Sequence, residues 1–203
     1  MRSKPFLSDT KWAGQRVGIL GGSFNPPHQG HIHISLIAKR MLGLDYIWWL
    51  VTPQNPLKDS KETRSYDERF AACLDITKTH PHIIVSDFEQ RMQLTYTYET
   101  VLALTDSYPH TDFVLLMGMD NALSFHKWDN WRNILDKMAT AHIARPPFWS
   151  MIEACPLKNL ATQKHIFVNR GLKAKLKPHI SYWIMQNMMM DISSTEIRAE
   201  SNI

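Results

Sequence analysis

The sequence predicts an α/β fold in which a Rossmann-like, doubly wound parallel sheet forms a single domain. Strands and helices are expected to alternate along the chain, and several expected strands are apolar throughout, as strands covered on both faces are. The 203 residues are 44% hydrophobic, which is enough for one sizeable core. We expect residues 15–203 to form this domain and residues 1–14 to be a flexible lead.

The first part of the chain alternates strands with helices. Residues 16–20 are mostly apolar and end at a Gly-Gly pair, which predicts a strand. Residues 30–43 carry an apolar stripe at helical spacing. Residues 46–51 are nearly all apolar and predict a second strand. Residues 65–79 again show helical spacing, with Arg69 expected on the solvent side.

The rest of the chain continues the alternation. Apolar runs of strand length predict further strands, and apolar residues three or four apart predict further helices. Residues 146–163 show the weakest pattern and are expected to form a loop or a small insertion. The other expected elements are strands at 82–85, 113–117, 140–144 and 165–168, and helices at 96–107, 131–137 and 195–199.

Basic residues slightly outnumber acidic ones. The formal net charge of +4 and the sequence pI of about 9.1 suit a polyanionic ligand such as a nucleotide. They would also suit weak nucleic-acid binding, but the basic residues are spread along the chain. The one modest cluster, residues 170–177, is interpreted as a solvated face or loop. We therefore expect no nucleic-acid partner.

The sequence also predicts the compartment. No apolar run approaches the roughly 20 residues that a membrane helix needs, and the first 11 residues lack the apolar segment of a secretory signal. Cys73 and Cys155 have no neighbours at metal-ligand spacing, so we interpret them as reduced side chains. These observations predict a cytoplasmic protein with no membrane partner. They do not predict the oligomeric state.

Unusual loops follow four of the expected strands. In a doubly wound sheet the carboxyl ends of the strands meet at one edge, and ligands bind there. The segment GGSFNPPHQGH follows the first strand, TPQNPLK the second, GMDN the fourth and ARPP the fifth. Four such loops on one rim predict a ligand site.

The first of these loops has the features of a phosphate site. Gly21 and Gly22 let backbone N–H groups approach an anion closely, and the following helix points its positive N-terminal end at the same place. His28 and His31 are one helical turn apart and can donate to phosphate oxygens. The alternative is that each histidine only caps the helix or packs locally. The pattern H-x-G-H after a Gly-Gly strand exit favours the phosphate interpretation.

A second anion site is expected near the end of the chain. In DISSTEIR, residues 191–198, the hydroxyls of Ser193, Ser194 and Thr195 and the guanidinium of Arg198 fall close together at a helix start. The alternative is an ordinary capping box. The sequence has neither a G-x-x-x-x-G-K-[ST] loop nor a G-x-G-x-x-G fingerprint, so a nucleotide would be held by a different device.

Together these two segments resemble the nucleotidyltransferase superfamily with (H/T)xGH and ISSTxIR signatures. Within it, roughly residues 16–199 are similar to the bacterial nicotinate-nucleotide adenylyltransferases. GGSFNPPHQGH matches that family's GGxFxPxHxGH, although Asn25 stands where Asp is frequent. The chain ends at Ile203, whereas the family usually continues with another helix or two. The resemblance implies the nucleotidyltransferase fold.

The resemblance also implies roles for individual residues. Lys58 would bind a phosphate, Asp120 the ATP ribose, and the segment 95–97 the nicotinate carboxylate. Trp128 would stack on the pyridine ring. Taken alone, Lys58 could be a solvated lysine, Asp120 a helix N-cap and Trp128 a core aromatic. The implied catalytic residues are His28, His31, Lys58 and Arg198; the ATP-binding residues are Gly21, Gly22, Ser23, Phe24, Gly118, Asp120, Ser193, Ser194 and Thr195; the substrate-binding residues are Tyr96, Thr97, Trp128 and Arg145.

The implied reaction joins ATP and nicotinate mononucleotide to give nicotinate adenine dinucleotide and pyrophosphate, in NAD biosynthesis. The attacking phosphate is ionised at neutral pH, so positioning and charge stabilisation suffice. Mg²⁺ is expected to bind mainly through the ATP phosphates, with no metal site built by the protein.

Three alternatives stay open at this point. The acceptor could be nicotinamide mononucleotide or phosphopantetheine, although Trp128 and the Tyr96-Thr97 segment argue against the latter. The chain could be a fragment of a class I aminoacyl-tRNA synthetase, but no K-M-S-K-S-like loop follows. It could also be a non-catalytic nucleotide sensor or a nucleic-acid binder on the same fold.

Overall fold

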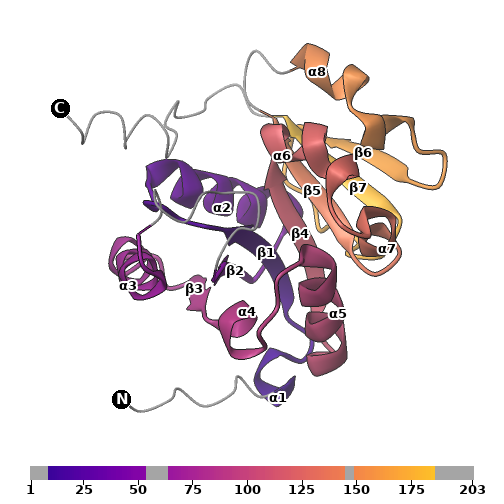
Figure 1. Cartoon of the computed structure of the whole chain (residues 1–203). Helices are drawn as coiled ribbons and strands as arrows, with labels where there is room; N and C mark the ends of the chain where they lie inside the picture. Colours follow the sequence, from indigo (N-terminus) through magenta and orange to yellow (C-terminus); the bar gives the residue numbers. More distant parts are fainter. Residues whose placement is uncertain (1–8, 54–63, 145–148, 186–203) are drawn as a thin grey trace.

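The computed structural model describes residues 9–53, 64–144 and 149–185 and contains one seven-stranded sheet (Figure 1). Every neighbouring pair of strands is parallel, which confirms the predicted fold class. The strand order is β3-β2-β1-β4-β5-β7-β6. The strands are β1 (Arg16–Gly22), β2 (Tyr46–Val51), β3 (Ile83–Ser86), β4 (Asp112–Gly118), β5 (Ala139–Ala144), β6 (Lys164–Val168) and β7 (Ile180–Met185).

The direction of strand addition reverses at β1. From β1 the chain adds β2 and β3 on one side, and then returns to add β4 and β5 on the other side. In doubly wound sheets the loops on the two sides of such a reversal diverge, and ligands bind in the crevice between them. This point is where the sequence analysis expects the ligand.

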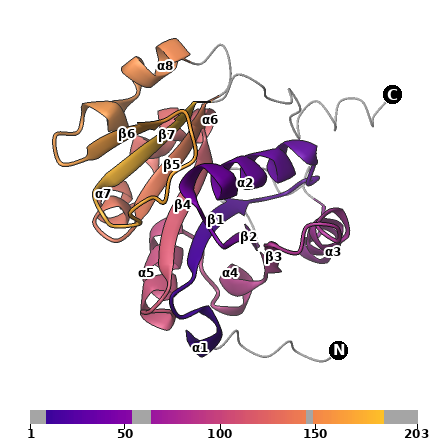
Figure 2. The same cartoon turned by 180° about the vertical axis from the view of Figure 1, so that it is seen from behind.

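Helices cover both faces of the sheet (Figures 1 and 2). Because side chains alternate along a strand, β2 sends Trp49 to one core and Trp48 to the other, and both are fully buried. One core lies under α2 (Gln29–Leu42) and α3 (Tyr66–Ile76). The other lies under α1 (Asp9–Trp12), α4 (Phe88–Arg91), α5 (Thr97–Ser107), α6 (Met119–Ser124), α7 (Trp131–Leu135), α8 (Trp149–Ala154) and the short 3-10 helices η2 (Phe125–Lys127) and η3 (Pro156–Asn159).

The second half of the sheet corrects the sequence analysis. The strand β7 was not predicted, yet it lies inside the sheet between β5 and β6. No helix separates it from β6; residues 169–179 instead form an extended connection that packs Ala174 and Leu176 against the core under α2 (Figure 2). The interval 146–163 was expected to be irregular, and its described part contains α8 and η3.

The amino-terminal segment is also more ordered than predicted. Residues 9–12 form α1, and Trp12 is only 1% exposed. Its ring meets those of Trp48 and Tyr46 edge to face, with centroids 4.9 Å and 5.0 Å away. Thr111 Oγ1 donates to the Trp12 carbonyl at 2.9 Å. The predicted flexible lead over residues 1–14 is therefore wrong for residues 9–14, because Trp12 closes the amino end of one core.

None of the helices in the described ranges is long and apolar enough to cross a membrane. Both cysteines, Cys73 and Cys155, are buried and free, as the sequence analysis expects.

A buried polar network crosses β5 and β7. His142 is fully buried, and its Nε2 lies 3.0 Å from Thr140 Oγ1. Thr140 donates to Ser181, which donates to Gln163, so Thr140 accepts from His142 Nε2–H. His142 Nδ1 has no hydrogen-bond partner in the described part of the chain. Burial, and secondarily the neighbouring His165, lowers the pKa of His142 to about 3.

We predict that Trp12→Ala lowers the free energy of unfolding by about 3–5 kcal/mol, because it removes a fully buried aromatic side chain. Urea denaturation followed by circular dichroism measures this loss. Phe167→Ala is the control, since Phe167 is 49% exposed, and should cost less than about 1 kcal/mol. Equal costs for the two variants would mean that α1 adds nothing to the core.

We predict that His142 weakens the fold in acid. A histidine whose pKa is lowered on folding binds a proton more readily in the unfolded state, so stability is lost as the pH falls from about 6.5 towards 3. Going from about pH 7 to about pH 5 should cost about 2 kcal/mol through this residue. His142→Phe should reduce the acid loss of unfolding free energy by that amount. If His142→Phe and the wild type lose the same unfolding free energy between these two pH values, His142 is protonated in the folded state.

Candidate active site

The exits of β1 and β4, where a ligand crevice is expected, carry one glycine each. Gly21 is exposed and follows the buried run of β1, and Gly118 ends β4, the neighbouring strand. A methyl group added at either glycine would meet no atom of the described chain within 4 Å. The position of an added Cβ at each of these two glycines is therefore open, which leaves room for a ligand to approach the backbone there.

The loop after β1 is fixed by a buried aromatic residue. Phe24 is 2% exposed, and its ring stacks on Trp49 at a centroid distance of 4.8 Å. Its backbone lies in the left-handed region, with φ of 46°, which a residue other than glycine adopts only where its surroundings enforce it. The same ring lies 4.9 Å from that of His31. The loop conformation and the histidine position are thus linked through one side chain.

The two histidines cap α2 through one nitrogen each. His28 is the N-cap residue, and its Nδ1 accepts the Gly30 N–H at 3.1 Å. In return His31 Nδ1 accepts the His28 N–H at 3.2 Å. The two rings lie 3.9 Å apart between centroids. This arrangement is a capping box built from imidazoles instead of hydroxyl and carboxylate groups.

The cap determines which ring nitrogen carries the proton. A nitrogen that accepts an N–H bond is unprotonated, so the neutral ring carries its proton on Nε2. Both histidines therefore present Nε2–H as a donor. Of the two interpretations drawn from the sequence, the structure shows the capping of α2; phosphate binding stays a prediction.

The N-terminus of α2 also has an electrostatic preference for anions. Of the three longest described helices, α3 carries Asp67 and Glu68 in its first turn and α5 carries Glu99, whereas the first turn of α2 has no acidic residue. The positive end of the α2 dipole is thus not balanced by a carboxylate of its own first turn. An incoming phosphate can fill that position.

The exit of β4 presents a carboxylate. Gly118 is the N-cap of α6, and Asp120 lies in the first helical turn with its side chain exposed. Asp120 is therefore not the N-cap that the alternative interpretation would make it. Its carboxylate is placed at the rim, where it can accept hydrogen bonds from a ligand's hydroxyl groups.

At the start of α5, an acidic side chain of the helix itself already accepts hydrogen bonds from backbone N–H groups. Glu99 Oε2 accepts the backbone N–H groups of Thr95 and Tyr96, each at 3.0 Å. These bonds lower the pKa of Glu99. Tyr96 is 45% exposed, and Thr97 is the first residue of the helix. Any carboxylate held here would meet the remaining first-turn amides.

Trp128 has features of both interpretations proposed from the sequence. Its ring packs on buried Phe125 with a centroid distance of 5.3 Å, as a core aromatic does. It is nevertheless only partly buried, so part of the ring faces outward at the end of η2. Stacking on a ligand and packing on Phe125 are therefore compatible.

Several predicted site residues lie outside the described residues: Lys58, Arg145, Ser193, Ser194, Thr195 and Arg198. Within residues 9–53, 64–144 and 149–185, no three His, Cys, Asp or Glu side chains gather in the manner of a metal site.

One residue near the site was misplaced by the sequence analysis. Arg69 was expected on the solvent side of its helix, but it is 2% exposed and donates only to backbone carbonyls. Helical spacing alone could not reveal this, because its neighbours Asp67 and Glu68 are indeed exposed.

The chain is similar to known proteins in both sequence and fold. A family model described as cytidylyltransferase-like matches residues 19–200. A probable nicotinate-nucleotide adenylyltransferase of Ruegeria sp. is 46% identical over 182 residues, covering 90% of this chain and 95% of the relative. One of Cereibacter sphaeroides is 40% identical over 184 residues, covering 90% and 96%.

The fold also matches solved structures. Plasmodium falciparum nicotinic acid mononucleotide adenylyltransferase complexed with NaAD has a TM-score of 0.69 at 19% identity, covering 91% of this chain and 83% of that one. At this identity the likeness concerns the fold. Given the relatives matched along almost their whole length, the chain belongs to the cytidylyltransferase-like family and, within it, to the nicotinate-nucleotide adenylyltransferases.

Proposed function

We propose that this protein joins ATP and nicotinate mononucleotide to give nicotinate adenine dinucleotide and pyrophosphate, a step of NAD biosynthesis. The observation that carries the proposal is the imidazole cap of α2: two histidines at a helix N-terminus whose Nδ1 atoms accept backbone N–H groups, so that each neutral ring carries its proton on Nε2. The names of the relatives support the choice of substrates.

In the proposed reaction the 5′-phosphate of nicotinate mononucleotide attacks the α-phosphorus of ATP. A P–O bond forms to the mononucleotide, and the bond to pyrophosphate breaks. The nucleophile is already ionised, so the protein needs only to align the two phosphates and stabilise the developing charge. We assign His31 Nε2–H to the α-phosphate and His28 to a flanking phosphate.

Other residues are proposed to hold ATP. The backbone of Gly21, Gly22, Ser23 and Phe24 borders the phosphates, and Gly118 leaves room beside them. Asp120 accepts hydrogen bonds from the ribose. By the resemblance, Lys58, Arg198 and the hydroxyls of Ser193, Ser194 and Thr195 add further phosphate contacts.

The nicotinate end is proposed to lie towards α5 and η2. Trp128 would offer its exposed face to the pyridine ring. The first-turn amides at Thr97 would meet the carboxylate beside Tyr96, with Arg145 contributing from the exit of β5. Since the Glu99 carboxylate already accepts hydrogen bonds from two amides of this segment, few backbone donors remain for the nicotinate carboxylate.

Mg²⁺ is proposed to bind through the β- and γ-phosphates of ATP. The cation would neutralise charge on the leaving pyrophosphate. We propose a cytoplasmic location, where ATP is available.

We predict that His31→Asn lowers kcat by about a hundredfold, since it removes one donor to the transition state. Asparagine retains an acceptor near the position of Nδ1, so the cap and the melting temperature should be largely kept. Pyrophosphate release from MgATP and nicotinate mononucleotide measures the effect. His33→Asn, on the same helix, is the matched control and should change kcat less than about twofold. A near-normal kcat for His31→Asn would contradict the assigned role.

We predict that pyrophosphate release is fast with nicotinate mononucleotide and at least about tenfold slower with nicotinamide mononucleotide, because the amide lacks the charge that free helix amides attract. Comparable kcat/KM values would argue against the carboxylate contact at Thr97. Release with neither, in folded protein, would leave the fold correct and the proposed acceptor wrong.

A further inference from the structure

Arg69 makes an uncommon set of hydrogen bonds at the carboxyl edge of the sheet. Its Nε donates to the Arg64 carbonyl at 3.1 Å, and its Nη1 to those of Ser23 at 2.6 Å and Thr52 at 2.9 Å. Its Nη2 donates to the Pro53 carbonyl at 2.8 Å. Four of the five guanidinium N–H groups are thus used, all on backbone. Within the described ranges no carboxylate pairs with it.

The carbonyls that Arg69 binds belong to three separate stretches of backbone. Ser23 lies in the loop after β1, Thr52 and Pro53 lie just after β2, and Arg64 precedes α3. Only a planar, branched donor can reach all of them at once from one helix.

Two further bonds tie the same stretches together. The Thr52 N–H donates to the Gly22 carbonyl at 3.0 Å, and the Arg64 N–H to Asn25 Oδ1 at 3.3 Å. The loop after β1 is thus fastened to the exit of β2 at Gly22 directly and at Ser23 through Arg69, and Asn25 ties it to the segment before α3. Asn25, where the family often has Asp, supplies a neutral acceptor here.

This fastening sets the direction of a peptide group beside the proposed phosphates. In a trans peptide the C=O and the following N–H point in opposite directions. Because Arg69 draws the Ser23 carbonyl inward, the Phe24 N–H is turned to the opposite side. Phe24 then holds its ring against His31.

We propose that Arg69 is a positioning residue for ATP: it holds the loops after β1 and β2 so that backbone amides and His31 meet the phosphates in the right geometry. Arg69 itself touches no reacting atom. This inference rests on the proposed function, and its test keeps the two separable.

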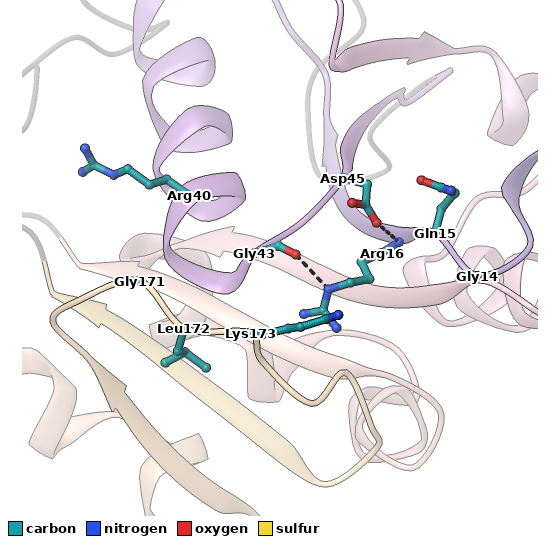
Figure 3. A pocket seen from close by; sticks show the side chains of 9 residues that line it. All are labelled: Gly14, Gln15, Arg16, Arg40, Gly43, Asp45, Gly171, Leu172 and Lys173. Carbon is teal, nitrogen blue, oxygen red and sulfur yellow. Dashed lines mark hydrogen bonds between the residues drawn. The ribbon is translucent and has the colours of Figure 1, made fainter.

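The chain offers a matched control at the other end of the sheet. Arg16 also donates to backbone carbonyls: to that of Gly43 at 2.8 Å (Figure 3), and to those of Leu42 at 2.9 Å and Ala174 at 2.7 Å. It lines an open pocket of about 670 Å³ beside the amino ends of β1 and β2. Its bonding is of the same kind as that of Arg69, but it lies away from the rim.

We predict that Arg69→Met raises KM for ATP and lowers kcat, so that kcat/KM for ATP falls by about tenfold to a hundredfold, as small misplacements of reacting groups do. KM for nicotinate mononucleotide should change less than about twofold, because its ring site lies elsewhere on the rim. Arg69→Lys should recover part of the loss. Arg16→Met should lower the melting temperature without changing KM for ATP.

Two measurements separate the outcomes. The dissociation constant of a non-hydrolysable ATP analogue, measured by calorimetry, tests the role of Arg69 without any reaction. If the wild type binds the analogue but makes no dinucleotide, only the proposed function fails. Hydrogen exchange of peptides spanning residues 19–31 should rise in Arg69→Met and stay unchanged in Arg16→Met. Equal KM values for ATP in Arg69→Met and wild type would overturn the proposal. So would failure of both Arg69 variants to fold, since Arg69 would then be a folding residue.

Discussion

The structure depends on the reversal of strand addition at β1. A parallel sheet that grows in two directions from one strand buries that strand on both faces and both edges. It also separates the loops that leave β1 and β4, so that backbone groups at this point have no neighbouring loop to cover them. Gly21 and Gly118 stand at these exits with open space above them. The fold therefore gives a ligand access to the backbone at this point before any side chain contributes to binding.

The chemistry of the crevice follows from a property of imidazole. A serine or aspartate at the N-cap of α2 would satisfy a helix amide and have little left to offer a phosphate. His28 and His31 satisfy amides through Nδ1 and retain a proton on Nε2, on the opposite side of the ring. Capping and ligand binding are therefore not alternatives here. The cap fixes the orientation and the tautomer that ligand binding requires.

The elements that the sequence predicts well are those whose burial is uniform. A strand covered on two faces must be apolar at every position, so β2 and β4 are recognisable without any partner. Trp12 was missed because its order comes from a distant contact with Trp48. The strand β7 was missed because its apolar run is broken by Ser181, a polar residue that is buried through hydrogen bonds to Thr140 and Gln163. Arg69 was misplaced because periodicity sorts residues by polarity, and backbone carbonyls that bury a guanidinium leave no pattern in the sequence.

The first turns of α2 and α5 differ in their acidic residues, and this difference affects which anions each helix N-terminus can bind. At α5, Glu99 already accepts from two amides, so an added anion competes with a carboxylate of the protein. At α2 no acidic residue occupies the first turn, and the nearby guanidinium of Arg69 is bound by carbonyls that leave its charge in place. A polyphosphate, with several charges, is therefore favoured at α2, whereas a single carboxylate suffices at α5. The two ends of the rim thus differ in the charge that they can accept, and in the proposed reaction this difference would direct the polyphosphate of ATP to α2 and the nicotinate carboxylate to α5.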